Sequence, residues 1–425
     1  MNKIILLLFS VLCLMGRAQG NSEWKMCVVS DVHLMAPELL KSDGKAFQDY
    51  LSSDRKLLGE SVEIMDSITN RLLAEHPKVL LVTGDLTKDG ENVSHQYLVD
   101  HFLSKLRRSG VRVFVVPGNH DVNNPHAVVF DGDKTRRTTT VSPSEFASVY
   151  ADYGYRQALA RDAASLSYVA QLASGLRLIA IDACKYEEND FDKNICVTGG
   201  RIKPAMRRFI REQADAAKKA GCKVVVMMHH GVVPHFSAQP VVLPEYLVDD
   251  YPAVGRMLHD CGADVAFTGH FHSQDIARDS TVTDVETGSL VSYPHPYRVI
   301  EVSGDKMSVT THNLRSIKSL AAQGEDLWQK SQKFARLSVA KMAEGYLPQN
   351  TPPAMRDTIV KVVSDAYLYH LAGDEHPSED FVKEKCRLAE QVSAVAPNMA
   401  PMLDAIVTSL STDQAPSDNQ AVLHY

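Results

Sequence analysis

Five short stretches of the sequence place carboxylate, amide or imidazole side chains directly after an apolar run. They are Asp31-Val32-His33, Gly84-Asp85, Gly118-Asn119-His120-Asp121, His229-His230 and Gly269-His270-Phe271-His272. Each stretch alone is a weak signal, because short combinations of these residues occur by chance in long chains. Together, however, five such stretches that each follow an apolar run are hard to produce by accident.

The apolar runs that precede these stretches have the length and composition of buried strands. We expect strands at residues 26–30, 79–83, 111–116, 176–181, 224–228 and 265–268. Between them, apolar residues recur at helical spacing, as at Leu98, Phe102 and Leu106, and glycines such as Gly110 mark the ends of helices. This alternation predicts an α/β layered fold. Because ligands of open α/β sheets bind at the carboxyl ends of strands, the five stretches are expected to meet in one crevice.

The remainder of the chain changes character twice. Residues 281–313 contain short alternating stretches, which predict a β-rich end to the core domain. From about Leu314 onward, helical patterns dominate, at residues 327–342, 354–371 and 379–395. We therefore expect a core domain over residues 21–315 and a helical C-terminal extension over residues 316–425. No motif in the extension could supply a ligand, so we expect it to be dispensable for the chemistry.

The first 20 residues have the pattern of a cleavable export signal. Lys3 precedes an apolar run of about a dozen residues, and Ala18-Gln19-Gly20 provides small residues for cleavage. A transmembrane helix is the alternative, but it needs roughly 20 apolar residues. A lipid-modified Cys13 is disfavoured by the bulky Leu12 before it. The pattern predicts a secreted or periplasmic protein without stable membrane insertion.

Charge and cysteine content narrow the possible functions further. The net charge of -7 is mild, and no block of like charges is present, so nucleic-acid binding is not expected. Cys184 and Cys196 frame a polar loop and are expected to pair in an oxidising compartment. Three other cysteines are expected to be small buried side chains: Cys27, Cys222 and Cys261. No Cys-x-x-Cys pair is present, which argues against a cysteine zinc site.

The five stretches, in this order, resemble the calcineurin-like metallophosphoesterase superfamily over roughly residues 25–315. The resemblance implies an α/β fold, a four-layer α/β/β/α metallophosphoesterase sandwich, with the helical C-terminal extension outside it. It also implies a dinuclear metal-dependent phosphoric ester hydrolase, in which a metal-bridging hydroxide attacks a small phosphate ester in line.

The resemblance also assigns roles to individual residues. The first metal would bind Asp31, His33 and His272, the second would bind Asn119, His229 and His270, and Asp85 would bridge the two. His120 becomes the proton donor, and Asp121 the residue that orients its ring. His230 and His235 are interpreted as substrate contacts, with a supporting or solvent-exposed position as the equal alternative.

The metals and the substrate stay open at this point. Lys88 stands where the purple acid phosphatase branch has a tyrosine ligand, so the purple iron chromophore is not expected. The ligands suit two divalent or mixed-valence ions of Mn, Fe, Zn or Ni. The stretch 131–138, with Lys134, Arg136 and Arg137, is interpreted as a solvated loop, with a substrate lid as the alternative.

Several readings of the function remain possible. Monoesters and diesters are equally compatible with the five stretches, and the sequence gives no indication of the oligomeric state. A catalytically silent, metal-stabilised binding or scaffold protein is the alternative from another class. A nuclease is less favoured, because a duplex requires phosphate-neutralising cations.

Overall fold

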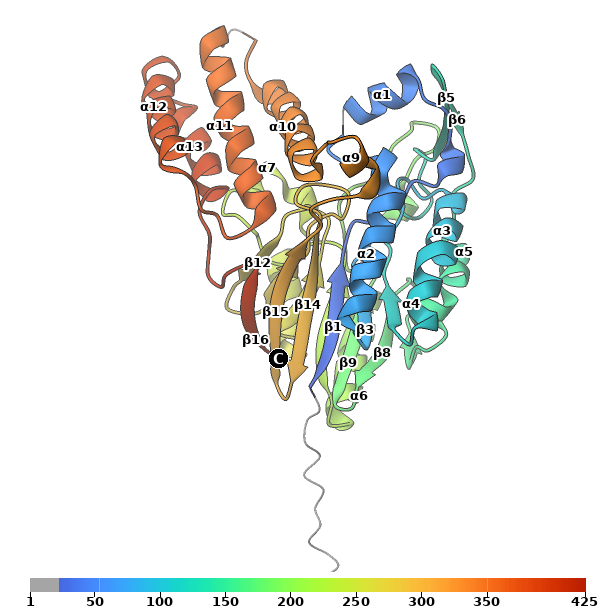
Figure 1. Ribbon diagram of the computed structural model, residues 1–425. Helices are drawn as coiled ribbons and strands as arrows, with labels where there is room; N and C mark the ends of the chain where they lie inside the picture. The colour runs from blue at the N-terminus through green and yellow to red at the C-terminus, as the bar shows by residue number, and fades with distance from the viewer. Residues whose placement is uncertain (1–22, 53, 350) are drawn as a thin grey trace, which may run out of the picture.

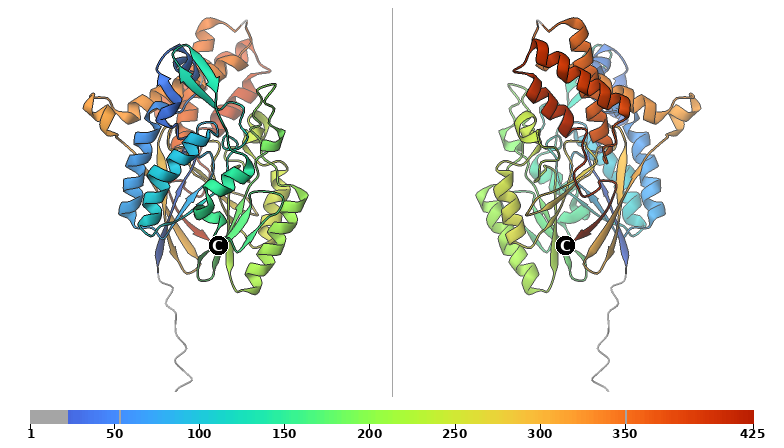
Figure 2. Two further views of the ribbon diagram at one scale, coloured as in Figure 1. Left: turned by 90° about the vertical axis from the view of Figure 1, so that its right-hand side faces the viewer. Right: turned by 90° about the vertical axis from the view of Figure 1, so that its left-hand side faces the viewer.

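The computed structural model describes residues 23–425 except residues 53 and 350. The expected export signal, residues 1–20, therefore lies outside the described residues. Two β-sheets lie face to face, with helices on their outer sides, and a further group of helices sits over one end of this sandwich (Figures 1 and 2). This is the expected four-layer α/β arrangement with a helical C-terminal region.

The first sheet has the strand order β16-β15-β14-β1-β3-β4. Its strands are β1 (Trp24–Val29), β3 (Val79–Val82), β4 (Arg112–Val115), β14 (Pro296–Ser303), β15 (Lys306–Asn313) and β16 (Gln420–His424). Strands β1, β3 and β4 run parallel, and β14, β15 and β16 add antiparallel pairs at one side. The parallel strands deliver Asp31, Asp85 and Asn119 to the same edge of the sheet.

The second sheet has the order β12-β13-β11-β10-β9-β8-β7. Its strands are β7 (Ala160–Arg161), β8 (Tyr168–Ala173), β9 (Leu176–Ile181), β10 (Lys223–Met228), β11 (Val265–Thr268), β12 (Asp275–Arg278) and β13 (Thr283–Glu286). Strands β9, β10, β11 and β13 are parallel. A small third sheet joins β2 (Leu40–Ser42), β5 (Val128–Asp131) and β6 (Lys134–Arg137).

The central strands are apolar throughout because both of their faces are buried. In β10, Val225 and Met227 belong to the core between the two sheets, whereas Val226 and Met228 pack toward helices on the outer side. The outer helices of the second sheet are α6 (Pro204–Lys219) and α8 (Tyr251–Asp260). On the other side lie α2 (Ser61–Glu75), α3 (Asn92–Leu98), α4 (Ser104–Arg108) and α5 (Pro143–Val149).

The C-terminal extension is built mainly from α10 (Leu327–Tyr346), α11 (Pro353–Ala372), α12 (Glu379–Val395) and α13 (Ala400–Ser409). Three shorter helices complete the description: α1 (Lys45–Ser52) and α7 (Gln239–Val242) belong to the core domain, and α9 (Lys318–Ala322) begins the extension. The long helices bury their apolar faces against one another and against Phe236, Phe271 and Tyr293 of the core domain. No helix of the described residues is long and apolar enough to cross a membrane.

The central strands match the prediction, but several other elements of the described residues were not predicted, and three of them bear on the fold. Residues 131–138, interpreted as a solvated loop, form part of a hairpin whose strand β6 is fully exposed. After α13 the chain returns to the core as β16, which pairs with β15 (Figure 1). Strand β8, at the far side of the second sheet, was also not expected.

The expected Cys184–Cys196 disulfide is not present in the structure, where both cysteines are free. The Sγ atom of Cys184 lies 3.3 Å from the carbonyl oxygen of Pro117, and that of Cys196 lies 3.5 Å from the carbonyl oxygen of Asn119. Both thiols therefore contact carbonyl oxygens of the turn before His120. Cys27 is buried as expected, whereas Cys222 and Cys261 are only partly buried.

Candidate metal centre and active site

The side chains that the sequence analysis singled out as ligands come together at the carboxyl ends of the parallel strands. Several of them sit in the left-handed backbone region, which non-glycine residues adopt only at a cost of about 1 to 3 kcal/mol each. The φ angles are 49° at Asp31, 40° at His33, 48° at Asp85, 80° at His270 and 73° at His272. Such strain persists only where the surrounding structure enforces it, and it turns these side chains sharply out of the strand direction into the crevice.

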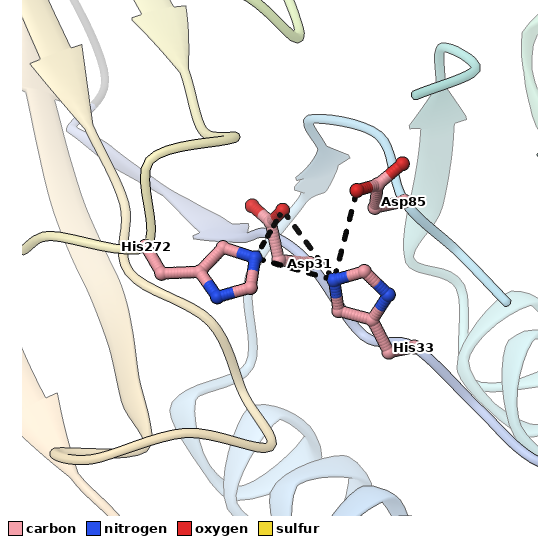
Figure 3. A group of neighbouring side chains, drawn as sticks. All are labelled: Asp31, His33, Asp85 and His272. Carbon is pink, nitrogen blue, oxygen red and sulfur yellow. Dashed lines mark hydrogen bonds and ion pairs between the residues drawn. The ribbon is translucent and has the colours of Figure 1, made fainter. Parts of the chain in front are cut away.

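The first group contains Asp31, His33, Asp85 and His272, each of which has a side-chain nitrogen or oxygen close to the others (Figure 3). Asp31 Oδ1 lies 3.1 Å from His272 Nε2 and 3.7 Å from His33 Nε2. Asp85 Oδ2 lies 3.6 Å from His33 Nε2. All four side chains are almost completely buried. The group offers two carboxylates and two imidazoles to one point.

The second group contains Asp85, His229 and His270. His229 Nε2 lies 3.3 Å from Asp85 Oδ2 and 3.2 Å from Asn119 Oδ1. The other ring nitrogen of His229, Nδ1, forms a 2.8 Å hydrogen bond to the carbonyl oxygen of Thr83, which sets the orientation of the ring. Asp85 is common to both groups, so its carboxylate lies between the two points where ligand atoms converge.

The donor atoms of the first group fit a bound cation better than a set of internal hydrogen bonds. The Nε2 atoms of His33 and His272 face each other at 3.2 Å, and the buried Asp31 Oδ1 has only its 3.1 Å contact with His272 Nε2, which lacks the geometry of a hydrogen bond. An unpaired buried carboxylate oxygen is costly, and a metal ion bound by these atoms removes that cost. The residues present therefore fit a metal centre, while oxygen and imidazole ligands leave the identity of the metal open.

Glycines before two of the ligands allow these elements to approach closely. A Cβ atom on Gly118 would lie 2.1 Å from Asp85 Oδ1, and one on Gly84 would lie 2.5 Å from His229 Nδ1. Any larger residue at either position would displace a ligand side chain. The glycines in Gly84-Asp85 and Gly118-Asn119 are thus required by packing as well as by the turns that they form.

His120 is next to the candidate ligand Asn119, and it lines the pocket together with Asp85. Its Nε2 lies 4.0 Å from Asp85 Oδ2, and its Nδ1 lies 2.8 Å from Asp89 Oδ1. Burial and Lys56 lower the pKa of His120, but Asp85 and the hydrogen bond to Asp89 outweigh them, so its pKa lies above the ordinary value. The sequence analysis missed Asp89.

The expectation that Asp121 orients His120 does not match the structure. The Asp121 carboxylate accepts hydrogen bonds from the backbone N–H groups of Gly118, Leu86 and Thr87 at 2.8 to 3.0 Å. Burial and then the nearby Asp85 raise its pKa to about 7. Asp121 thus ties the turn after β4 to the turn after β3, and Asp89 is the residue that contacts the imidazole of His120.

Two histidines interpreted as substrate contacts lie away from the pocket. His230 is buried behind His270, with ring centroids 4.5 Å apart, and its Nε2 contacts the carbonyl oxygen of Thr198 at 2.9 Å. His235 lies still deeper, where its Nδ1 is 2.6 Å from Asp275 Oδ1. The interpretation of both histidines as substrate contacts is therefore wrong, because neither side chain reaches the open space above the ligands.

A pocket of about 490 Å³ opens over the two ligand groups. Its lining includes Lys56 and Tyr246 from the core domain, and Ser338, Lys341 and Met342 from α10. Lys341 also donates a hydrogen bond to the carbonyl oxygen of Ser52. The extension thus forms part of the pocket wall, although it contributes no residue to the two ligand groups. This contact was not predicted when the extension was expected to be dispensable for the chemistry.

Comparisons with known proteins were made for both the sequence and the structure. A dimetal phosphatase from Danio rerio matches with a TM-score of 0.48 and 16% identity, covering 72% of this chain and 98% of its own. A putative 5'-nucleotidase from Staphylococcus aureus matches with a TM-score of 0.41 and 14% identity, covering 74% of this chain and 57% of its own. GAP50, the anchor in the inner membrane complex of Plasmodium, matches with a TM-score of 0.38 and 12% identity, covering 70% of this chain and 89% of its own.

No curated protein matches the chain. A family model described as calcineurin-like phosphoesterase matches residues 25–274, which is more than half of the sequence and includes both ligand groups. The chain therefore belongs to the calcineurin-like phosphoesterase family and is a metallophosphoesterase, a hydrolase of phosphoric ester bonds.

Proposed function

We propose that this protein is an exported hydrolase of a small phosphate ester that works with two metal ions. The observation that carries the proposal is that Asp85 belongs to both ligand groups, at the floor of a pocket of about 490 Å³. A pocket of this size suits a small ester, since small-molecule sites typically occupy about 300 to 1,000 Å³.

Each residue of the site has a role in this proposal. Asp31, His33 and His272 would hold one ion, Asn119, His229 and His270 would hold the other, and Asp85 is common to both ligand groups. When bound, two such ions neutralise the phosphoryl oxygens and activate a water molecule for in-line attack.

His120 delivers the proton that the departing oxygen needs. Its Nδ1 is occupied by Asp89 at 2.8 Å, which leaves Nε2 for the leaving group. The hydrogen bond to Asp89 favours the protonated form of the ring, which a proton donor requires.

Hydrolysis assays test the proposal directly. Protein reconstituted separately with Mn²⁺, Zn²⁺ or Fe²⁺ is given a phosphomonoester and a phosphodiester that share one leaving group. Turnover of one or both is expected, and their ratio identifies the preferred ester. A protein that binds two ions and hydrolyses neither would instead be the silent binding or scaffold protein.

Export is supported by the pattern of the first 20 residues. Cleavage after Gly20 predicts that the mature chain begins at Asn21 when it is produced by a host with a general secretion pathway. Sequencing the N-terminus of the protein recovered outside the cytoplasm tests this part separately from the chemistry. A full-length chain found only in the cytoplasm would contradict it.

A further inference from the structure

A second group of ionisable side chains lies between the core domain and the extension. Asp275 at the start of β12, His370 near the end of α11 and Glu375 just after α11 each place one ligand atom within 4.8 Å of the others. His370 Nδ1 is 2.7 Å from Glu375 Oε1 and 3.8 Å from Asp275 Oδ2. All three side chains are buried, with exposures of 1% for His370, 2% for Glu375 and 9% for Asp275.

The hydrogen bonds of this junction do not satisfy all of its buried carboxylate oxygens. Glu375 Oε2 has no hydrogen-bond partner, although the residue is only 7% exposed and its carboxylate contacts His370. Asp413 Oδ1, close by, has none either. Leaving a buried carboxylate oxygen unpaired is unfavourable, and a cation bound by it removes the penalty.

Further carboxyl groups also crowd the junction, where burial and mutual repulsion disfavour their charged forms. Asp374, Asp413 and Asp418 form a neighbouring group. Burial and then Asp275 raise the pKa of Asp418 to about 9, and burial and then Glu375 raise the pKa of Asp413 to about 6.

The cationic groups that face the junction do not bind its unpaired carboxylate oxygens directly. The nearest guanidinium, that of Arg298, donates to the carbonyl oxygens of Asp275, Glu286 and Asp418 instead of to their carboxylates. His235 contacts Asp275 through its Oδ1 atom, and His376, the residue after Glu375, is exposed. Buried Arg298 interacts electrostatically with the carboxyls of the junction, but Glu375 Oε2 is left without a hydrogen-bond partner.

The backbone at the junction is closely packed. Gly373 has a φ of 70°, and a Cβ atom there would lie 2.1 Å from the carbonyl oxygen of Gln274. The loop that carries Glu375 is thus pressed against the residue before Asp275. This close packing brings ligands from two parts of the chain together, as a structural metal site requires.

We propose that Asp275, His370 and Glu375 bind a divalent ion of the Mn²⁺ or Zn²⁺ class, separate from the catalytic centre, that fixes α11 to the core domain. One imidazole and two carboxylates favour such an ion over Ca²⁺ or Mg²⁺, which prefer oxygen ligands alone. Figure 1 places α11 above the edge of the sheet that contains β12, and the two elements are in contact.

The ion has a structural consequence for the active site. Tyr367, one turn before His370 on α11, accepts a 3.0 Å hydrogen bond from Arg55 Nη1. Arg55 Nη2 in turn donates to the carbonyl oxygen of Phe271, which lies between the ligands His270 and His272. Holding α11 in place therefore braces the loop that carries two catalytic ligands.

The proposal is tested with the full-length chain, which is stripped of metal and then titrated with Mn²⁺ or Zn²⁺. The number of bound ions and the midpoint of thermal unfolding are measured at each step. We expect the wild-type chain to bind about one ion more than the two of the catalytic centre, with a rise in the midpoint as the last ion binds. The variant is Glu375→Gln, which keeps an acceptor for His370 but removes the charge.

The matched control is Glu379→Gln, which makes the same change of charge at a side chain that is 93% exposed. Glu375→Gln is expected to lose about one ion and the corresponding rise in the midpoint, while Glu379→Gln keeps both. If Glu375→Gln does not fold, His370→Gln replaces it.

Three results overturn the proposal. The first is a wild-type chain that saturates at about two ions, both lost in catalytic-site variants, because the junction is then a metal-free ion cluster. The second is a third ion that Glu375→Gln or His370→Gln retains in full. The third is a junction that takes up Ca²⁺ but neither Mn²⁺ nor Zn²⁺.

Discussion

Replacing Asp89 by asparagine tests the pairing of His120 most directly. The Asp89 side chain is 1% exposed, and Asp89 Oδ1 lies 2.8 Å from Nδ1 of His120. Asparagine retains the shape of the side chain but removes its charge. The protonated imidazole thereby loses its nearest anion, and we expect the pKa of His120 to fall.

The size of the effect follows from this contact. An opposite charge within about 4 to 6 Å shifts a pKa by about 1 to 3 units, equivalent to about 1.4 to 4 kcal/mol. A general acid works only in its protonated form, so the rate falls as the pH rises through its pKa. The alkaline limb of the pH–rate profile should therefore move to lower pH by about 1 to 3 units in Asp89→Asn. At a pH above both limbs, the rate should fall by about 10- to 1,000-fold.

The fold should tolerate this change. Lys88 contacts Asp89, and its Nζ also lies 3.0 Å from Glu91 Oε1. The side chains of Lys88 and Glu91 are fully buried. After the substitution, Lys88 and Glu91 remain as one balanced ion pair. Glu91→Gln is the matched control, because it removes a carboxylate from the same lysine without touching His120.

The assay is a pH–rate profile on an alkyl phosphate, with metal content and the midpoint of unfolding measured for every variant. Glu91→Gln should keep the wild-type alkaline limb. In a His120→Asn background, Asp89→Asn should cause no further loss of rate, because its effect acts through the imidazole. The reasoning is refuted if the two single variants shift the limb equally, or if the double variant is slower than His120→Asn alone.

Three further predictions concern the metal centre, the proton donor and the pocket wall. Asp85→Ala should lower the metal content well below two ions per chain and abolish turnover, as measured by elemental analysis and rate assays, and near-normal values for both would show that Asp85 is not a shared ligand. His120→Asn should keep both ions and lose about 100- to 10,000-fold on an alkyl phosphate but much less on a nitrophenyl phosphate, whose leaving group needs no proton, and an equal loss on both would assign His120 another role. Lys341→Ala should raise KM by no more than about fivefold, because an exposed ion pair contributes up to about 1 kcal/mol. The rise is expected only for esters with a second anionic group. An equal rise for esters that lack a second anionic group would contradict this role.

The central strands and the convergence of the candidate ligands were predictable because their signals are local. A short apolar run followed by a glycine turn marks both a buried strand and the point where it ends, as at Val79–Val82 before Gly84-Asp85. Parallel strands bring such points to one edge of the sheet. The convergence of Asp31, Asp85 and Asn119 therefore followed from the strand pattern and the resemblance together.

The partner of His120 was not predictable, because it depends on how two turns pack. Asp121 is adjacent to His120 in the sequence, but its side chain points back toward the turn after β3. Asp89 precedes His120 by 31 residues and reaches it only because the loop after β3 folds over the loop after β4. Strand β16 was missed for a related reason, since its alternating residues are mostly exposed and have no apolar run to mark them.

The residues expected to perform the reaction and the residues expected to select the substrate come from different parts of the chain. Every residue of the two catalytic ligand groups belongs to the core domain, whereas Ser338, Lys341 and Met342 of α10 form one wall of the pocket. The extension is held to the core at its far end too, because β16 pairs with β15 along five residues. A helix group anchored in this way cannot swing clear of the pocket without breaking strand pairs or uncovering its apolar contacts with Phe271 and Tyr293. Substitutions in the wall provided by α10 should therefore change which esters fit, without moving any ligand of the metal centre.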